Sequence, residues 1–309
     1  MGCSGSLNSL QVSAARPSGR ETLKGGRLKH ARGVRTVMTR RRFYAPPEAF
    51  SADRKSANLS GDETRHLRNV LRLKAGDEIY LFDGTGNEFH CRIQTCARDS
   101  AAANVIEQVD AAQPESGLNL TLAIALMKGE KFDLVIQKST ELGVTRVIPV
   151  ITSRADVRIK SDDDGERKKT RWKRIALEAT KQCGRARLIE IGKPTMFSDL
   201  VRGGIADPVA STDASEDACA PVALPNADVR IMFAEREGAS LAEALGDSQN
   251  HPKTVTALVG PEGGWAEDET DQARAAGWKI VTLGGRILRA ETAAIVIAAL
   301  IQHRFGDLN

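Results

Sequence analysis

The chain of 309 residues is long enough for about two domains, and its 41% of apolar and 27% of charged residues are ordinary for a globular protein. No apolar run approaches the roughly 20 residues that span a bilayer, so we expect no membrane segment. The net charge is only +4, and the five cysteines contain no CxxC pair, which argues against a disulfide framework or a metal site and for a reducing compartment.

Residues 1–38 are rich in Ser, Gly and Arg and show no apolar periodicity. Between Met1 and Ala45, ten residues are basic and only Glu21 is acidic. We predict a disordered leader or a targeting extension here. An organellar transit peptide has this composition, but Met38 stands just before the first structured-looking segment and favours a leader upstream of the true start. We therefore expect a cytoplasmic protein, or an organellar one if residues 1–38 are a transit peptide.

Residues 39–112 show a pattern of short strands and turns. Glu78–Phe82 and Glu88–Ile93 are runs of strand-forming residues separated by an Asp-Gly-Thr-Gly turn, and together they predict a hairpin. Val105–Val109 predicts one more strand. We therefore expect a small β-barrel or a similar all-β domain, followed by a linker that contains Pro114.

From Leu118 onward, strand patterns alternate with helix patterns. Leu120–Leu126 is a continuous apolar run, as in a strand that is buried on both faces. Such alternation predicts an α/β domain with a mostly parallel sheet over residues 118–309, with a surface insertion at 207–228. The further strands predicted are Arg146–Ile151, Arg187–Ile191, Val229–Phe233, Thr254–Val259 and Lys279–Leu283, and the helices are Phe132–Ser139, Trp172–Gly184, Ala266–Ala276 and Glu291–Phe305.

The segment Leu258–Gly264, with the sequence LVGPEGG, follows a predicted buried strand. Open α/β sheets bind ligands beyond the carboxyl ends of their strands. Three glycines and a proline make a rigid turn with little side-chain cover, so backbone groups can approach a ligand closely. The turn is neither a GxGxxG fingerprint nor a Walker loop. Its spacing alone fits two interpretations equally well: a turn that binds a ligand, and a purely structural turn in which Trp265 is a packing residue.

A second glycine turn, Leu283–Ala293 with the sequence LGGRILRAETA, also follows a strand and leads into the last helix. Arg289 stands at the strand–helix junction beside the glycines, where a guanidinium suits a phosphate or a developing oxyanion. Glu291 lies at the start of the helix, where a negative charge is favoured by the helix dipole. Helix capping is therefore enough to explain the presence of Glu291 at this position. For Arg289, a functional role is the favoured interpretation.

Cations occur at other positions that are expected to face a ligand. Lys128 follows the first strand of the α/β domain, and Arg185 follows a predicted helix that carries Glu178 and Gln182 on one face. These side chains either line the same pocket as the glycine turns or pair with one another in solvent, and the spacing leaves both interpretations open.

Two stretches of the small domain mix cations, aromatic rings and a histidine. RNA-binding proteins use this mixture, because cations hold phosphates while flat rings stack on bases. The alternative is that the apolar residues are core, the histidine is a satisfied side chain and the arginines are solvated. The candidate RNA contacts are Arg41, Arg42 and Phe43 in one stretch and His66, Arg68 and Arg72 in the other, with Lys128 and Arg185 from the α/β domain.

Taken in order, six segments resemble the bacterial 16S rRNA (uracil-N3)-methyltransferase family of the SPOUT class. The last two together are highly specific, whereas each one alone is weak. Members of the family usually begin just before the first segment, so residues 1–38 are additional, and the 207–228 insertion is longer than expected. The segments are Arg41–Tyr44, His66–Arg72, Lys138–Gly143, Glu178–Arg185, Leu258–Gly264 and Leu283–Ala293.

The resemblance implies an N-terminal PUA-like β-barrel that binds RNA and a C-terminal SPOUT domain with a knotted, mostly parallel sheet. It implies S-adenosylmethionine as the cofactor, a homodimer, and 16S rRNA of the small ribosomal subunit as the partner. Carried over by position, the cofactor contacts are Leu258, Gly260, Gly263, Leu283, Gly284, Ile287 and Leu288, to which we add Pro261, Glu262 and Gly264 of the first turn.

The implied reaction is methylation of a uridine at N3, an atom normally hidden in a base pair, so the base must be splayed out. The N3 proton must leave, and negative charge then spreads onto the flanking carbonyl oxygens. Arg289 is the expected catalytic group that stabilises this charge, and Glu291 is a candidate base that its helix-start position weakens. Two alternatives stay open: a SPOUT reaction at another RNA site, and a ribosome-assembly factor that binds RNA with an inactive methyltransferase fold.

Overall fold

We describe a computed structural model of the chain over residues 40–155, 157, 161–203, 227–245 and 251–308. The predicted leader at 1–38 and the predicted insertion, apart from its last two residues, lie outside the described residues. Over the described parts, no helix is long and apolar enough to cross a bilayer.

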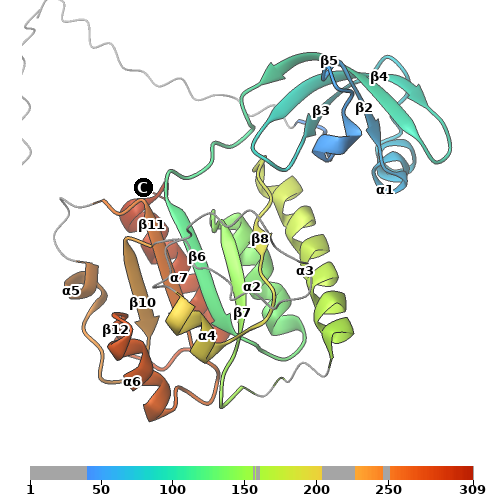
Figure 1. The fold of residues 1–309 in the computed structure, drawn as a ribbon. Coiled ribbons are helices and arrows are strands. Elements are labelled where there is room, and N and C mark those ends of the chain that lie inside the picture. The colour runs from blue at the N-terminus through green and yellow to red at the C-terminus, as the bar shows by residue number, and fades with distance from the viewer. Residues whose placement is uncertain (1–39, 156, 158–160, 204–226, 246–250, 309) are drawn as a thin grey trace, which may run out of the picture. The chain divides into compact units, whose positions relative to one another are not determined.

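The N-terminal region is a curled five-stranded sheet with the strand order β1-β3-β4-β5-β2 (Figure 1). Its strands are β1 (Arg42–Tyr44), β2 (Ser56–Leu59), β3 (Glu78–Phe82), β4 (Glu88–Cys96) and β5 (Ala101–Val109). β1 and β3 pair in parallel, and the other pairs are antiparallel. The predicted hairpin is present as the antiparallel pair β3 and β4. In the turn between them, Asp83 accepts hydrogen bonds from the backbone N–H groups of Thr85 (2.8 Å) and Asn87 (3.2 Å).

Alternating side chains of this sheet form its core, including Phe43, Ile79, Leu81 and Phe89. Three short helical segments complete the region: a 3-10 helix at Pro47–Ala49, α1 (Gly61–Arg65) and a π-helical turn at His66–Val70. A π-helical turn is a rare element that occurs frequently at functional sites.

The C-terminal region is an α/β domain around a sheet in which every described strand pair is parallel. The strand order is β12-β10-β11-β6-β7-β8, and β9 also pairs with β7. The strands are β6 (Asn119–Ala125), β7 (Arg146–Ile151), β8 (Glu190–Ile191), β9 (Thr195–Met196), β10 (Val229–Phe233), β11 (Thr254–Val259) and β12 (Lys279–Val281). The helices are α2 (Glu130–Glu141), α3 (Asp162–Cys183), α4 (Phe197–Arg202), α5 (Leu241–Leu245), α6 (Glu267–Ala275) and α7 (Ala290–Phe305).

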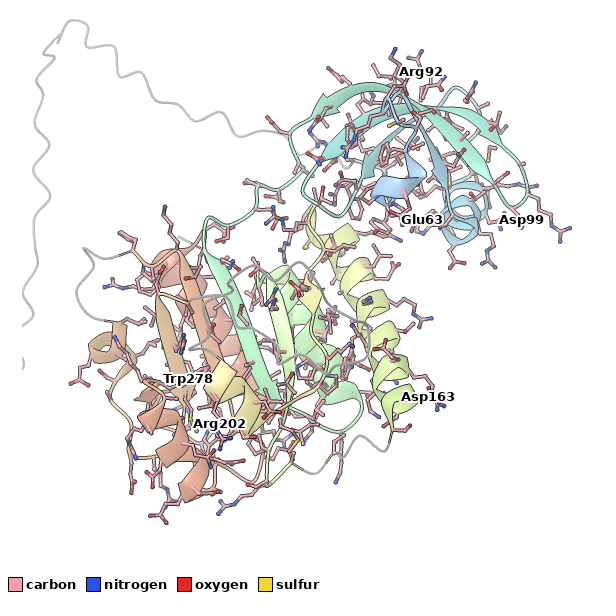
Figure 2. The ribbon with its side chains drawn as sticks, viewed as in Figure 1. Glu63, Arg92, Asp99, Asp163, Arg202 and Trp278 are labelled. Atoms are coloured by element: carbon pink, nitrogen blue, oxygen red, sulfur yellow. The ribbon has the colours of Figure 1, made fainter. Side chains whose placement is uncertain are left out.

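Helices cover both faces of this sheet, as a parallel sheet requires (Figure 1). On one face, α2, α3 and α7 contribute Phe132, Trp172 and Ile297 to the main core. On the other face, a second core contains Phe197 of α4 and Ala273 of α6, together with Trp278, whose position Figure 2 marks. The predicted architecture, an α/β domain preceded by a PUA-like curled sheet, is confirmed.

Three predicted strands, Arg146–Ile151, Val229–Phe233 and Thr254–Val259, have the bounds of β7, β10 and β11. The predicted strand at Arg187–Ile191 is wrong in length, because only Glu190 and Ile191 pair with β7. The helix predicted from Trp172 begins ten residues earlier, at Asp162. Ser161 caps this earlier start by accepting a hydrogen bond from the Asp164 N–H at 3.3 Å.

Candidate functional site

A cavity of about 550 Å³ lies beyond the carboxyl ends of β10 and β11, beside the start of α7. Three chain segments and part of α7 form its wall. They are Phe233–Glu235 after β10, the turn that follows β11, and the loop between β12 and α7. Its volume lies in the range of small-molecule sites, roughly 300 to 1,000 Å³. Both glycine turns singled out in the sequence therefore line one cavity.

The first turn, after β11, is held tightly by its own packing. A carbon added at Gly260 would lie 2.8 Å from the indole ring of Trp265. That ring is fixed in turn, because its N–H donates to the carbonyl oxygen of Phe233 at 2.8 Å. Gly264 adopts a left-handed backbone (φ +68°) and donates its N–H to the carbonyl of Pro261. Glycine is thus required at two positions of this turn for two separate reasons.

Side chains from outside the first turn hold it from two directions. Lys131, in the first turn of α2, forms an ion pair with Glu262. The hydrogen bond that Lys131 donates to Glu262 raises the pKa of the Lys131 ammonium. Arg154, after β7, donates through Nη1 to the carbonyl oxygens of Gly263 (3.3 Å) and Trp265 (3.0 Å). The turn is therefore fixed to the sheet as well as to α2.

The second turn, between β12 and α7, is more open. Gly284 and Gly285 both have positive φ, +71° and +73°, and nothing lies within 4 Å of a carbon added at either. The neighbouring Ile287 is 72% exposed although it is a large apolar residue. At the start of the turn, Thr282 accepts a hydrogen bond from the Gly238 N–H at 3.0 Å and donates its own N–H to Ala239. This loop thus exposes backbone and apolar side chains around the cavity.

Arg289 and Glu291 occupy different positions relative to the cavity. Arg289 is the N-cap residue of α7, is exposed and lines the cavity. Its guanidinium forms no hydrogen bond or ion pair with any residue that the structure describes. Glu291 is nine-tenths buried in the first turn of α7 and does not line the cavity. Its Oε2 atom is buried without a hydrogen-bond partner in the described part of the chain.

Most of the expected cofactor contacts meet at the cavity. Leu258 instead lies in the core beneath the sheet, and Gly263 faces the side chain of Arg154. Sequence reasoning missed Lys131, Glu235 and Trp265, which also line the wall. The expected residues that line it are Gly260, Pro261, Glu262, Gly264, Leu283, Gly284, Ile287 and Leu288.

In the N-terminal region, Arg41, His66, Arg68 and Arg72 are exposed. Phe43 is 1% exposed in the core of the sheet. The side chain of Arg42 is 6% exposed and forms a bidentate pair with Glu88, with N–O distances of 3.2 and 3.0 Å. The exposed cations of this region can reach a polyanion, whereas the Arg42 guanidinium is engaged within the protein.

Two expected RNA contacts come from the α/β domain. Arg185 is 5% exposed, and its guanidinium donates to Glu115 and to the carbonyl oxygens of Thr140 and Val144 at 2.8 to 3.0 Å. Lys128 is exposed and lines a second, smaller pocket beside the cavity. Within the described ranges, no three His, Cys, Asp or Glu side chains are grouped so that they could hold a metal ion.

The chemistry of the wall suits a ligand with apolar and charged parts. Val259, Leu283 and Leu288 supply apolar surface, and the glycines leave backbone groups uncovered. Glu235 offers a carboxylate to a cationic group, while Arg286 and Arg289 offer cations to an anionic one. Such a wall accommodates a zwitterionic nucleoside-like molecule beside a second, polar reactant.

Comparisons with known proteins agree with this arrangement. Residues 114–302 match a family model described as an RNA methyltransferase domain, and residues 59–106 match an RNA methyltransferase PUA domain. A Ribosomal RNA small subunit methyltransferase E from Synechocystis sp. is 33% identical over 86% of this chain and 78% of its own length. The protein of that name from Bacillus subtilis is 28% identical over 80% of this chain and 90% of its own.

A solved structure is similar as well. The Ribosomal RNA small subunit methyltransferase E from Neisseria gonorrhoeae, crystallised bound to S-adenosyl methionine, is 31% identical to this chain. The two structures superpose with a TM-score of 0.70, over 87% of this chain and 100% of the other. The similarity therefore covers the curled N-terminal sheet and the α/β domain together.

Proposed function

Because the chain belongs to the ribosomal RNA small subunit methyltransferase E family, we propose that its cavity binds S-adenosylmethionine for methylation of N3 of one uridine in 16S rRNA. The observation that carries this proposal is the meeting of two distant glycine turns at one cavity, in a chain whose relative binds this cofactor through a similar fold. A ribosomal substrate of a bacterial enzyme would place the protein in the cytoplasm.

The residues of the cavity fit this cofactor. When bound, S-adenosylmethionine supplies an electrophilic methyl group on a positively charged sulfur. Gly260, Gly264 and Gly284 would contact it through backbone groups, and Leu283, Ile287 and Leu288 would cover its apolar parts. Leu258 and Gly263 would act indirectly, by supporting the first turn from below. Glu235 would complement its cationic groups, and Glu262, paired with Lys131, would form part of the wall.

Arg289 would stabilise the charge that develops on the uracil. Removal of the N3 proton leaves negative charge on the two flanking carbonyl oxygens, and a positioned cation lowers the energy of that state. The Arg289 guanidinium suits this role because it lines the cavity and has no hydrogen-bond or ion-pair partner in the described chain. Glu291 would accept the proton only after a rearrangement, since it lies buried behind the wall, so its role as a base stays a prediction.

His66 would be a further polar contact, and RNA would be held by the exposed cations of the N-terminal region, Arg41, Arg68 and Arg72. Their charges bind phosphates without reading sequence. Arg42, Phe43 and Arg185 would contribute by shaping this surface rather than by contacting RNA, because their side chains are buried.

A homodimer is also part of the proposal. α7 is apolar around most of its circumference, and residues such as Ile295 and Val296 are only partly covered while Leu300 is 39% exposed. A helix that is apolar all round is normally buried on every side. A second copy of the chain would cover this face. We expect a dimer in sedimentation equilibrium, and Leu300→Glu should shift it toward monomer; an unshifted dimer would place the interface elsewhere.

The modified nucleotide itself tests the main proposal. Mass mapping of 16S rRNA from a strain that lacks the gene should show loss of one N3-methyluridine, and the wild-type gene should restore it. An unchanged N3-methyluridine would exclude the proposed reaction and favour a methyltransferase of another RNA site. Calorimetry with S-adenosylmethionine addresses the other alternative, because an RNA-binding factor with an inactive fold would bind none.

Arg289→Ala should separate catalysis from cofactor binding. We expect kcat to fall about 100- to 1,000-fold, as when an oxyanion donor is removed, with the Kd of S-adenosylmethionine changed less than about threefold. Single-turnover methyl transfer and calorimetry measure the two quantities. Arg274→Ala on α6, an exposed arginine that lines no described pocket, is the matched control. Equal losses in both quantities would show that Arg289 serves the cofactor instead.

A further inference from the structure

A second pocket, of about 100 Å³, adjoins the cofactor cavity and shares Lys131, Pro261 and Glu262 with it. It is formed at the carboxyl end of β6, by Leu126, Met127 and Lys128, and at the start of α2 by Lys131. Arg154, which follows β7, closes it. Since β6 is the next strand after β11 in the sheet, the two pockets are neighbours along one sheet edge.

Cations dominate the wall of this pocket. Among the described residues that line it, three are cations, Lys128, Lys131 and Arg154, and one is a carboxylate, Glu262. The carboxylate is already paired with Lys131. Arg154 uses only Nη1 for its described hydrogen bonds, and both acceptors are neutral carbonyls. Because a guanidinium carries five N–H donors, Arg154 has further donors for an anion.

The size of the pocket limits what it can hold. A volume of 100 Å³ corresponds to roughly three molecules of liquid water, so a nucleoside does not fit but one tetrahedral oxyanion does. Arginine and lysine together are the usual protein partners of phosphate. The cofactor has its own, larger cavity next to this pocket, with Arg286 available to its carboxylate.

We propose that this pocket binds a backbone phosphate of the RNA substrate, at or next to the target nucleotide, and we name it the phosphate subsite. The proposal rests on the proposed function for the identity of the RNA. Phosphate contacts fix the register of a nucleic acid on a protein. A phosphate held in this pocket, next to the cofactor cavity, would set the distance between the target base and the methyl donor.

The placement of Arg154 supports this positioning role. A carbon added at Gly263 would lie 3.4 Å from Arg154 Cβ, so the side chain of Arg154 runs closely along the turn. Its Nη1 hydrogen bonds then fix the guanidinium relative to Gly263 and Trp265. Any anion bound by Arg154 is therefore held in register with the turn that lines the cofactor cavity.

Lys128→Ala and Arg154→Ala test the subsite, with Lys173→Ala, an exposed cation of α3, as the charge-matched control. The probe is the small ribosomal subunit from a strain that lacks the enzyme. We measure its Kd over a series of KCl concentrations, the Kd of S-adenosylmethionine by calorimetry, and methyl transfer at saturating subunit. The side-chain hydrogen bonds described above as holding the first turn come from Arg154 and Lys131, so Lys128→Ala remains informative if Arg154→Ala disturbs that turn.

Each test variant should weaken binding of the subunit about tenfold and reduce the slope of log K against log salt by about one. The Kd of S-adenosylmethionine should change less than about twofold, and Lys173→Ala should resemble wild type. Unchanged subunit affinity and slope in Lys128→Ala, or no salt-dependent binding by wild type, would overturn the proposal. Loss of cofactor affinity alone would assign the pocket to the cofactor carboxylate.

Failure of the proposed function gives a different result. If the wild-type enzyme makes no N3-methyluridine but the two variants still weaken binding of the ribosomal subunit, the reaction assignment is wrong and the phosphate subsite stands. If N3-methyluridine is made and neither variant alters binding, the reaction assignment stands and the subsite is wrong.

Discussion

At Gly260 an added carbon would meet the Trp265 ring at 2.8 Å, whereas at Gly284 nothing lies within 4 Å of the same position. The first turn uses glycine to make room for its own packing, and the second uses glycine to reach a left-handed backbone. The first turn is also held by Lys131 and Arg154, while the second is exposed over Gly284–Ile287. We infer that the first turn is a preformed wall and the second an adaptable one.

The largest effect is expected from Gly260→Ala. The added methyl group would displace Trp265 and break its hydrogen bond to Phe233, and such overpacking costs about 1 to 3 kcal/mol. The Kd of S-adenosylmethionine should rise about 10- to 100-fold, measured by calorimetry, with a shift in tryptophan emission. A variant that binds normally would show that the first turn is not preformed.

Gly284→Ala should weaken cofactor binding less than Gly260→Ala does, and only through the conformation of the backbone. A left-handed backbone costs an alanine about 1 to 2 kcal/mol, so cofactor affinity should fall about 5- to 30-fold without a change in tryptophan emission. Gly284→Asn is the matched control, because asparagine tolerates this conformation and should recover most of the affinity. Equal losses in both variants would point to a steric role and would remove the distinction between the turns.

Gly263→Ala should have the smallest effect. Its backbone is not left-handed, and the added carbon would lie 3.4 Å from Arg154 Cβ, a contact that a small shift relieves. We expect the Kd of S-adenosylmethionine to change less than about threefold in calorimetry. A loss as large as that of Gly260→Ala would show that the whole first turn, rather than its contact with Trp265, lacks room for a side chain.

Buried apolar runs made much of the fold predictable. β7, β10 and β11 are short segments rich in apolar and β-branched residues, and this pattern predicted their bounds. The first half of α3 has no apolar stripe before Trp172 and depends on the Ser161 cap and pairs such as Lys168 with Asp164. Local polar interactions of this kind leave no periodic signal, so the start of α3 was missed.

The site was predictable wherever it followed a strand. The two glycine turns obeyed the rule for ligands at the carboxyl ends of parallel strands, and Phe233–Glu235 obeys it too although it carries no glycine signal. Burial of Arg42 and Arg185 was not predictable. Their partners include Glu88 and Glu115, 46 and 70 residues away along the chain, and only tertiary structure brings such charges together.

The central strand pair has a consequence for how this protein is made. β6 pairs with β11, which leaves the ribosome about 130 residues later, roughly 6 to 26 s at ordinary rates of synthesis. The curled sheet at 42–109 has all its strands well before then. The RNA-binding half of the enzyme can therefore fold first. Until β11 emerges, β6 is an apolar strand without this partner and needs protection from aggregation.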